Sequence, residues 1–239
     1  MRYLTHFAKT DHASNAQLAD TLIILLPGAY QLPEDFIEQG FVSSLVENGL
    51  PIDLIMAELS FNDIVDETAF TQIHQELVEP AISKGYKNIW LAGISIGGYV
   101  AIAYANRYAD LLATPLAGLL LLAPYPGNRI TTGSITSSGG LDAWELSATH
   151  ENDIELSNWN WLKTHAASTE IEVYLSYGRD DRFADGHRMM AQILPDHNVE
   201  SIAGVHSWPV WHQLWGNFLN NRFVENIPLK HFSPQIRHA

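Results

Sequence analysis

Short runs of apolar residues recur along the chain and are typical of strands that are buried on both faces. The first of them, residues 21–26 (TLIILL), ends at Pro27-Gly28, a pair that favours a turn. The same pattern predicts five further strands, at residues 52–57, 88–93, 116–123, 171–177 and 198–203. Because neither face of these runs is polar, the sheet that they form must be covered on both sides.

Segments with apolar residues at helical spacing alternate with these strands. In residues 34–48, apolar side chains fall on one helical face, and Gly49 and Pro51 end the pattern. Comparable stripes predict helices over residues 69–84, 97–108, 186–194 and 208–221. This alternation predicts an α/β fold with a mostly parallel sheet and helices on both faces.

One segment, residues 124–170, interrupts the alternation between two late strands. It begins with polar, glycine-containing sequence (TTGSITSSGG), and a structureless loop of this length is rare inside a compact domain. We therefore expect a small cap or lid with helices around residues 141–146 and 156–165. Because no linker separates a second unit, we expect residues 1–239 to form one domain that includes this cap.

Charge and composition restrict the partners. The 239 residues carry a net charge of −14 and include no cysteine, which excludes disulfides and thiolate nucleophiles. An acidic surface repels phosphate backbones and anionic membranes, so we expect no nucleic-acid or membrane partner. The apolar runs are too short to span a bilayer, and the N-terminus lacks the apolar region of a signal peptide. We expect a soluble, cytoplasmic protein, and the sequence leaves its oligomeric state open.

The segment that carries the chemistry is GISIGG, residues 93–98, between a predicted strand and a predicted helix. Its first five residues match G-x-S-x-G, the pattern that exposes a serine at a sharp strand-to-helix turn. Glycines two residues to either side relieve the crowding there, and the glycine spacing matches neither a dinucleotide fingerprint nor a P-loop. Ser95 is thus a candidate nucleophile, and the alternative is a turn that only serves packing.

This turn in its context resembles the α/β-hydrolase superfamily, over about residues 20–223. The resemblance implies that Ser95 is followed by an acid and then a histidine, each in a loop after a strand. The family often shows G-x-x-D at the acid turn, which selects Asp181 in Gly178-Arg179-Asp180-Asp181. Asp180 is the alternative, Asp185 is a more distant one, and the unused aspartates would serve as turn or capping residues.

The family order also selects the base among eleven histidines. His206 follows the last predicted strand and precedes the last predicted helix, whereas His197 lies before that strand and His212 inside the helix. The six-residue spacing of His206 and His212 does not suit a two-histidine metal site. We expect His206 to be the base and no metal or cofactor to be needed.

A tetrahedral intermediate also needs backbone donors for its oxyanion. The resemblance implies the N–H of Ile96, directly after Ser95, and one from the loop that begins Pro27-Gly28. In that loop Ala29 is the expected donor and Tyr30 the alternative, because the commoner family form begins His-Gly and here Pro27 replaces the histidine.

These residues imply a serine hydrolase that cleaves carboxylic esters through an acyl-enzyme. The basic residues Arg129, Lys163, Arg179 and Arg182 are scattered in the sequence, which favours a small or medium neutral ester over an acyl-coenzyme A. A thioesterase, amidase or acyltransferase with the same triad is an alternative, and a non-catalytic binding protein is another. Two sets of tryptophans are interpreted mainly as packing residues: Trp208, Trp211 and Trp215 in the last helix, and Trp144, Trp159 and Trp161 in the cap.

Overall fold

The computed structural model describes residues 1–8, 19–165 and 171–224, and in these ranges seven strands form one sheet in the order β1-β3-β2-β4-β5-β6-β7. The strands are β1 (Tyr3–His6), β2 (Thr21–Leu26), β3 (Ile52–Ala57), β4 (Asn88–Ile94), β5 (Gly118–Leu122), β6 (Glu172–Gly178) and β7 (Val199–Ile202). Strands β2 to β7 all run parallel to one another, and β1 pairs with β3 in the antiparallel direction. The mostly parallel α/β sheet that the sequence predicts is confirmed, and all six expected strands are present.

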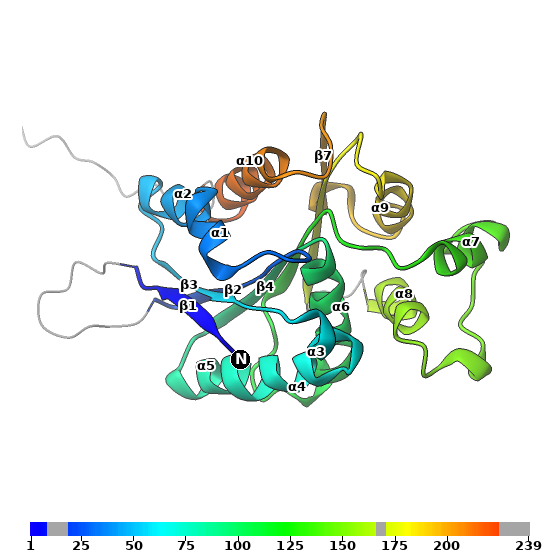
Figure 1. Cartoon of the computed structure of the whole chain (residues 1–239), viewed down its shortest axis with the longest axis horizontal. Coiled ribbons are helices and arrows are strands. Elements are labelled where there is room, and N and C mark those ends of the chain that lie inside the picture. The colour runs from blue at the N-terminus through cyan, green and yellow to red at the C-terminus, as the bar shows by residue number, and fades with distance from the viewer. Residues whose placement is uncertain (9–18, 166–170, 225–239) are drawn as a thin grey trace, which may run out of the picture.

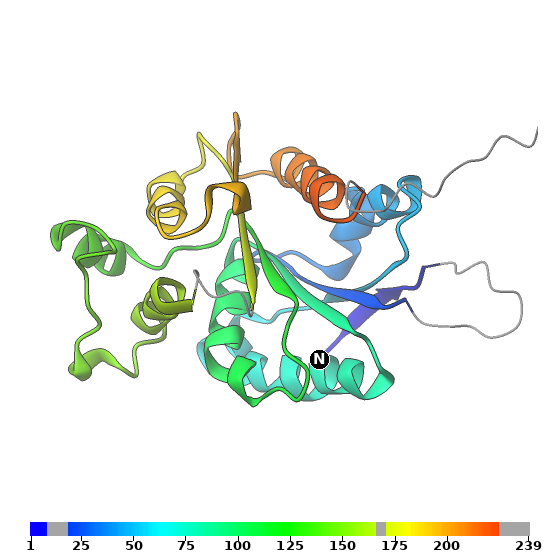
Figure 2. The same cartoon turned by 180° about the vertical axis from the view of Figure 1, so that it is seen from behind.

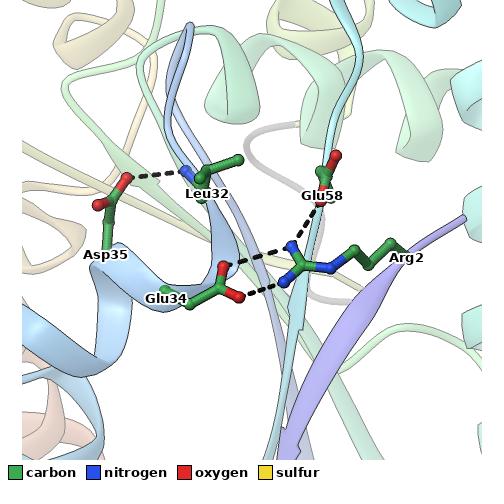
Figure 3. Close-up of polar contacts among 5 residues, drawn as sticks. All are labelled: Arg2, Leu32, Glu34, Asp35 and Glu58. Atoms are coloured by element: carbon green, nitrogen blue, oxygen red, sulfur yellow. Dashed lines mark hydrogen bonds and ion pairs between the residues drawn. The ribbon is translucent and has the colours of Figure 1, made fainter.

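The edge strand β1 has no counterpart among the expected strands. Its four residues alternate between exposed and partly exposed side chains, so it lacks the apolar run that identifies the buried strands. The preceding residue, Arg2, lies between Glu34 and Glu58, with its Nη1 donating to Glu58 Oε2 at 2.6 Å and to Glu34 Oε2 at 3.3 Å (Figure 3). These ion pairs are solvent-exposed, so they contribute little to the free energy of folding.

Helices lie on both sides of the sheet, as Figure 1 shows edge-on and Figure 2 shows from behind. One side carries α1 (Pro33–Glu38), α2 (Phe41–Glu47) and α10 (Trp208–Leu219). The other carries α3 (Phe61–Val65), α4 (Thr68–Gln72), α5 (Glu79–Lys84) and α6 (Ile96–Tyr108). α9 (Ala184–Ala191) packs against β6. Among the described residues no helix is both long and apolar enough to cross a membrane.

Two of the expected helices differ from the prediction in detail. The helix expected over residues 34–48 is divided into α1 and α2, because Gly40 adopts a left-handed conformation with φ of 84° between them. The helix expected over residues 69–84 contains a π-helical segment, Ile73–Val78, which ends two residues before Pro80. Proline cannot donate a helical hydrogen bond, and a widened turn is one way to accommodate it.

The 124–170 segment contains α7 (Arg129–Ser137) and α8 (Ile154–His165), and its residues 166–170 lie outside the described ranges. The expectation of a helix near 156–165 is confirmed, but that of a helix near 141–146 is wrong, because residues 141–143 form a turn. The helix forms instead in the polar stretch, where Asn128 Oδ1 accepts from the N–H groups of Ile130 at 2.7 Å and Thr131 at 3.1 Å. α8 packs against α6, while the action of the segment as a lid stays a prediction.

Tryptophans of the segment and of α10 are largely packing residues, as expected. Trp144, Trp159 and Trp161 are buried, and Trp159 Nε1 donates to the carbonyl of Pro126 at 2.8 Å. In α10, Trp215 is completely buried and its Nε1 donates to the carbonyl of Phe41 at 3.0 Å. These bonds satisfy the indole N–H groups that burial removes from water.

Candidate active site

Ser95 occupies the turn between β4 and α6. Its backbone has φ of 53° and ψ of −115°, a conformation that costs free energy for a residue with a side chain. Main-chain hydrogen bonds hold the residue there: its N–H donates to Leu122 O at 3.0 Å, and its carbonyl accepts from Tyr125 N at 2.8 Å. The turn therefore places Ser95 at the carboxyl end of the parallel strands, where α/β folds bind ligands.

The glycines around Ser95 are required by close contacts of the main chain. A Cβ atom on Gly93 would lie 2.3 Å from the carbonyl carbon of Gly97, and a Cβ on Gly97 would lie 2.2 Å from the carbonyl oxygen of Leu26. A Cβ on Gly98 would lie 2.8 Å from the Cβ of Pro124. The strand and the helix can meet at this turn only because these positions have no side chain.

Ser95, His206 and Asp181 form a continuous chain of hydrogen bonds. His206 Nε2 lies 2.9 Å from Ser95 Oγ, and His206 Nδ1 lies 2.6 Å from Asp181 Oδ2. Asp181 follows β6 and His206 follows β7, so three loops at one edge of the sheet supply the three residues. In the tautomer with a proton on Nδ1, the imidazole donates to Asp181 and its Nε2 accepts from the serine hydroxyl.

The carboxylate of Asp181 is removed from solvent, with none of its side chain exposed. Burial by itself would raise the pKa of Asp181, but hydrogen bonds from His206 and from the Phe183 N–H, which lies 2.8 Å from Oδ1, lower that pKa below its ordinary value. The group is therefore an anion at neutral pH, as a residue that stabilises a protonated imidazole must be.

The two alternative aspartates have other partners. Asp180 Oδ2 accepts from the Gly204 N–H at 3.1 Å, and the Asp180 N–H donates to the Gly204 carbonyl at 2.9 Å. Asp185 pairs with Arg188 one turn further along α9. Asp181 is thus the aspartate that contacts His206, whereas Asp180 joins the acid loop to the loop that carries the histidine.

Aromatic rings enclose His206 on two sides. The ring centroids of Phe183 and Trp211 lie 5.3 Å and 4.9 Å from that of His206, both in edge-on geometry. Trp211 was expected mainly to be a packing residue, and its contact with His206 was not predicted. The two rings restrict the imidazole to the plane in which it reaches both Ser95 and Asp181.

A second histidine, His187, lies beneath the site in α9. It is fully buried, its Nε2 donates to the Pro124 carbonyl at 2.8 Å, and its Nδ1 has no hydrogen-bond partner among the described residues. Burial lowers the pKa of His187 to about 4, so the ring is neutral at neutral pH. Pro124 is followed by Tyr125, whose N–H donates to the Ser95 carbonyl. By binding Pro124, His187 therefore helps to hold the segment that contacts the Ser95 turn. The sequence analysis did not single out this residue.

The other two histidines that were weighed lie away from this chain of bonds. His212 Nε2 lies 3.1 Å from Ser44 Oγ on α2, and His197 is exposed in a short 3₁₀ turn. In the described ranges, no three His, Asp or Glu side chains are grouped as metal ligands would be.

The expected oxyanion donors, Ala29 and Ile96, line the same cavity as Ser95. Ile96 is the first residue of α6, and an N–H at this position of a helix has no partner within the helix. Tyr30 is almost entirely exposed and is the left-handed residue of the early loop, with φ of 63°. The geometry favours Ala29 over Tyr30, and the role of both N–H groups stays a prediction.

The cavity beside Ser95 has a volume of about 390 Å³, a size typical of small-molecule sites. Most of its wall is apolar, and α3 contributes Phe61, Ile64 and Val65. No helix was predicted at the position of α3, although Phe61, Ile64 and Val65 have the spacing of one helical face. Further wall residues are Glu67, Tyr99, Tyr125, Ile154, Glu155, Arg182 and Phe183.

Comparison with known proteins gives a likeness in structure without a likeness in sequence. No family model matches the chain, and no curated protein matches it. A structure described as a ferulic acid esterase aligns over 91% of this chain and 96% of its own, with a TM-score of 0.61 and 15% identity. Serine hydrolase FphF of Staphylococcus aureus, described as fluorophosphonate-binding, aligns over 91% and 90%, with a TM-score of 0.59 and 15% identity.

A third solved structure is described as an α/β hydrolase. The α/β hydrolase MGS-MChE2, from a metagenome of sediments of the lagoon of Mar Chica, Morocco, aligns over 92% of this chain and 94% of its own, with a TM-score of 0.57 and 16% identity. At such low identity, the likeness concerns the fold. The seven-stranded sheet, the strained serine turn and these alignments together show that the chain has the α/β-hydrolase fold.

Proposed function

We propose that the protein is a serine hydrolase that cleaves carboxylic esters of small to medium size through an acyl-enzyme. The observation that carries this proposal is the chain of hydrogen bonds from Ser95 through His206 to Asp181, with distances of 2.9 Å and 2.6 Å. A serine hydroxyl is a poor nucleophile unless a base takes its proton, and this arrangement supplies the base and a group that orients it.

The proposed reaction has two halves. Ser95 Oγ attacks the ester carbonyl carbon while His206 Nε2 takes the hydroxyl proton, and the carbonyl oxygen becomes an oxyanion near Ile96 and Ala29. The intermediate then loses the alcohol, which receives the proton from His206. A water molecule, deprotonated by His206, attacks the acyl-enzyme and releases the carboxylic acid, and Ser95 recovers its proton. These steps need no cofactor.

Three further observations support this function over a non-catalytic role on the same fold. Ser95 is held in a costly conformation, and such strain persists where the surroundings enforce it, often at functional sites. A cavity of about 390 Å³ opens directly onto Ser95 and can receive one arm of a substrate. The structural neighbours described as a ferulic acid esterase and a fluorophosphonate-binding serine hydrolase are consistent with ester cleavage.

A fluorophosphonate probe tests the proposal directly. The folded protein should form one covalent adduct at neutral pH, mapped by peptide mass spectrometry to Ser95 and absent from Ser95→Ala. Ser44→Ala is the matched control, because Ser44 also lies near a histidine, His212, but outside the proposed site. Wild-type protein that stays unlabelled while folded would contradict the proposal.

Substrate class is tested next with p-nitrophenyl esters of increasing acyl length, together with thioester and anilide analogues. Turnover of the esters with Ser95-dependent release of nitrophenol is expected. If the thioesters or anilides were cleaved with a higher kcat/KM than the best ester, the thioesterase or amidase alternative would replace the esterase.

A further inference from the structure

A second, larger cavity adjoins the apolar cavity beside Ser95. It has a volume of about 1010 Å³ and lies between α7 and α9, where Arg129, Thr132 and Thr136 face Asp185 and Met189. Both cavities share Tyr125, Arg182 and Phe183 in their walls. Because only the apolar cavity includes Ser95, a substrate with its carbonyl at Ser95 can place one arm there and extend the other past these three residues.

The charged side chains in the two cavity walls differ in whether they already have polar partners. Each carboxylate already has partners: Glu67 pairs with Arg107 at 2.8 Å, and Asp185 pairs with Arg188. Glu155 Oε2 accepts from Asn128 N at 2.8 Å and from Thr131 Oγ1 at 2.7 Å. The carboxylates therefore do not compete strongly for a further cation.

The two arginines of the larger cavity differ from these carboxylates. Within the described part of the chain, neither Arg129 nor Arg182 forms an ion pair. The guanidinium carbon of Arg182 lies 4.7 Å from the centroid of the Phe183 ring, and that ring contacts His206. One aromatic ring thus separates an unpaired cation from the proposed base, in a chain whose net charge is −14.

We propose that the protein selects esters that carry a carboxylate on one arm, and that Arg182, with Arg129, binds this carboxylate in the larger cavity while an apolar arm fills the cavity beside Ser95. The inference rests on the proposed function and specifies its substrate class. A planar guanidinium donates two parallel hydrogen bonds to a carboxylate, which gives direction as well as affinity.

This substrate class differs from the neutral ester that the sequence favoured. That expectation rested on the scatter of Arg129, Lys163, Arg179 and Arg182 along the chain. In the fold, Lys163 and Arg179 donate to main-chain carbonyls, whereas Arg129 and Arg182 line one cavity. The scatter in sequence is therefore not a scatter in space.

The test compares substrates that differ only in charge. In one series the acyl arm ends in a carboxylate or in a carboxamide of the same shape, as p-nitrophenyl hemiesters of adipate and pimelate and their amides. In the other, the alcohol arm carries the charge, as acetate esters of hydroxybenzoate and hydroxybenzamide. The quantity measured is the ratio of kcat/KM for the carboxylate over that for the carboxamide, after subtraction of the spontaneous rate.

In at least one series, the wild-type ratio should be roughly tenfold or more in favour of the carboxylate and should fall as salt is added. Arg182→Gln should bring the ratio close to one, Arg182→Lys should retain part of it, and Arg129→Gln should lower it. Lys84→Gln is the control for net charge, because Lys84 is exposed at the end of α5 and lines neither cavity, and it should not change the ratio.

The outcomes separate this inference from the proposed function. If the protein cleaves the carboxamides and the carboxylates equally in both series, the inference is wrong and the esterase stands. The same conclusion holds if a preference survives both Arg182→Gln and Arg129→Gln. Failure of the proposed function would appear differently, as absence of turnover of every ester and of fluorophosphonate labelling at Ser95.

Discussion

The turn that carries Ser95 and the opposite wall of the cleft are held together by different means. Main-chain atoms surround the turn, and hypothetical Cβ atoms on Gly93 and Gly97 would lie only 2.3 Å and 2.2 Å from them. The wall from α3 and the larger cavity presents exposed side chains, including Phe61 and Arg182. The difference predicts that backbone packing fixes the geometry of the proposed reaction, whereas side chains that can be exchanged at little cost to stability select the proposed substrate.

Asp181→Asn should have the largest effect, because it removes the negative charge beside His206 Nδ1 and keeps a side chain of the same shape. An asparagine at this position no longer stabilises the imidazolium or enforces the proton on Nδ1, so kcat should fall by about 10⁴-fold, or roughly 5 kcal/mol in the barrier. The measurement is steady-state hydrolysis of the best p-nitrophenyl ester. Asp180→Asn is the matched control and should cost less than about threefold, since it retains an acceptor for the Gly204 N–H. The reverse order would mean that Asp180 is the acid.

Gly97→Ala should disrupt the turn itself. The new methyl group would meet the carbonyl oxygens of Leu26 and Pro27 at 2.2 Å and 2.6 Å, so the strand and helix must separate. We expect a loss of about 3 kcal/mol in the free energy of unfolding, measured by urea denaturation, together with loss of turnover.

Gly216→Ala provides the control for Gly97→Ala. Gly216 is also helical, but nothing lies within 4 Å of the Cβ that alanine would add. This substitution should leave stability unchanged or raise it by up to about 1 kcal/mol. Equal destabilisation by the two variants would show that contacts around Gly97 do not fix the turn.

His187 should make the support beneath the turn sensitive to acid. Burial lowers its pKa to about 4, whereas the unfolded chain binds the proton near 6.5. The unfolded state thus binds more protons between these values, so stability should fall by about 3 kcal/mol as the pH falls from 6.5 to 4 and stay level above 6.5. Asp181, whose lowered pKa lies below its ordinary 3.8, adds a loss only at still lower pH.

Urea unfolding at a series of pH values measures this slope. His187→Gln keeps a donor for the Pro124 carbonyl and removes the titrating group, so the slope between pH 6.5 and 4 should flatten. His197→Gln, at an exposed position, should leave it as in the wild type. A slope that His187→Gln does not alter would assign the acid sensitivity to other groups.

Phe61→Ala should have the smallest effect and act on the wall alone. The side chain lines the cavity beside Ser95 but is 57% exposed, so its removal deletes only part of an apolar contact. For a long acyl chain, kcat/KM should fall by about fivefold, or about 1 kcal/mol, with no change for acetate and none in stability. Leu111→Ala, at an exposed apolar residue outside the cavity, should change neither substrate. A loss that is equal for both chain lengths would place Phe61 in the support of the turn.

The six parallel strands and the turn of Ser95 could be predicted because those features depend on short stretches of chain, whereas the resemblance selected Asp181 and His206. A buried parallel strand requires a continuous apolar run, and each candidate residue follows such a run directly. The structure brings Ser95, Asp181 and His206 together as the resemblance implied, although their catalytic roles stay predictions until tested. The resemblance selected Asp181 over Asp180, and only the fold shows that these adjacent side chains of one loop have different partners.

Features that depend on contacts between distant segments were not predictable in this way. The edge strand β1 is defined by its pairing with β3, and α7 forms from polar residues that its Asn128 cap and its buried Thr131 and Ile135 stabilise. The cavity walls combine α3 with residues more than sixty positions further along the chain. No local pattern contains such a combination, and for this reason the shared cavity of Arg129 and Arg182 could not be predicted from the sequence.

The reciprocal bonds between Asp180 and Gly204 have a consequence for how this protein can be altered. They fasten the loop after β6 to the loop after β7, and the Arg179 N–H adds a bond to Ile202 O at 2.7 Å. We therefore expect the two loops that carry Asp181 and His206 to move as one unit, with little change in the distance between these two side chains. Transfer of only one of these loops into a related protein should disrupt the hydrogen bond between Asp181 and His206, whereas transfer of both loops together should preserve it.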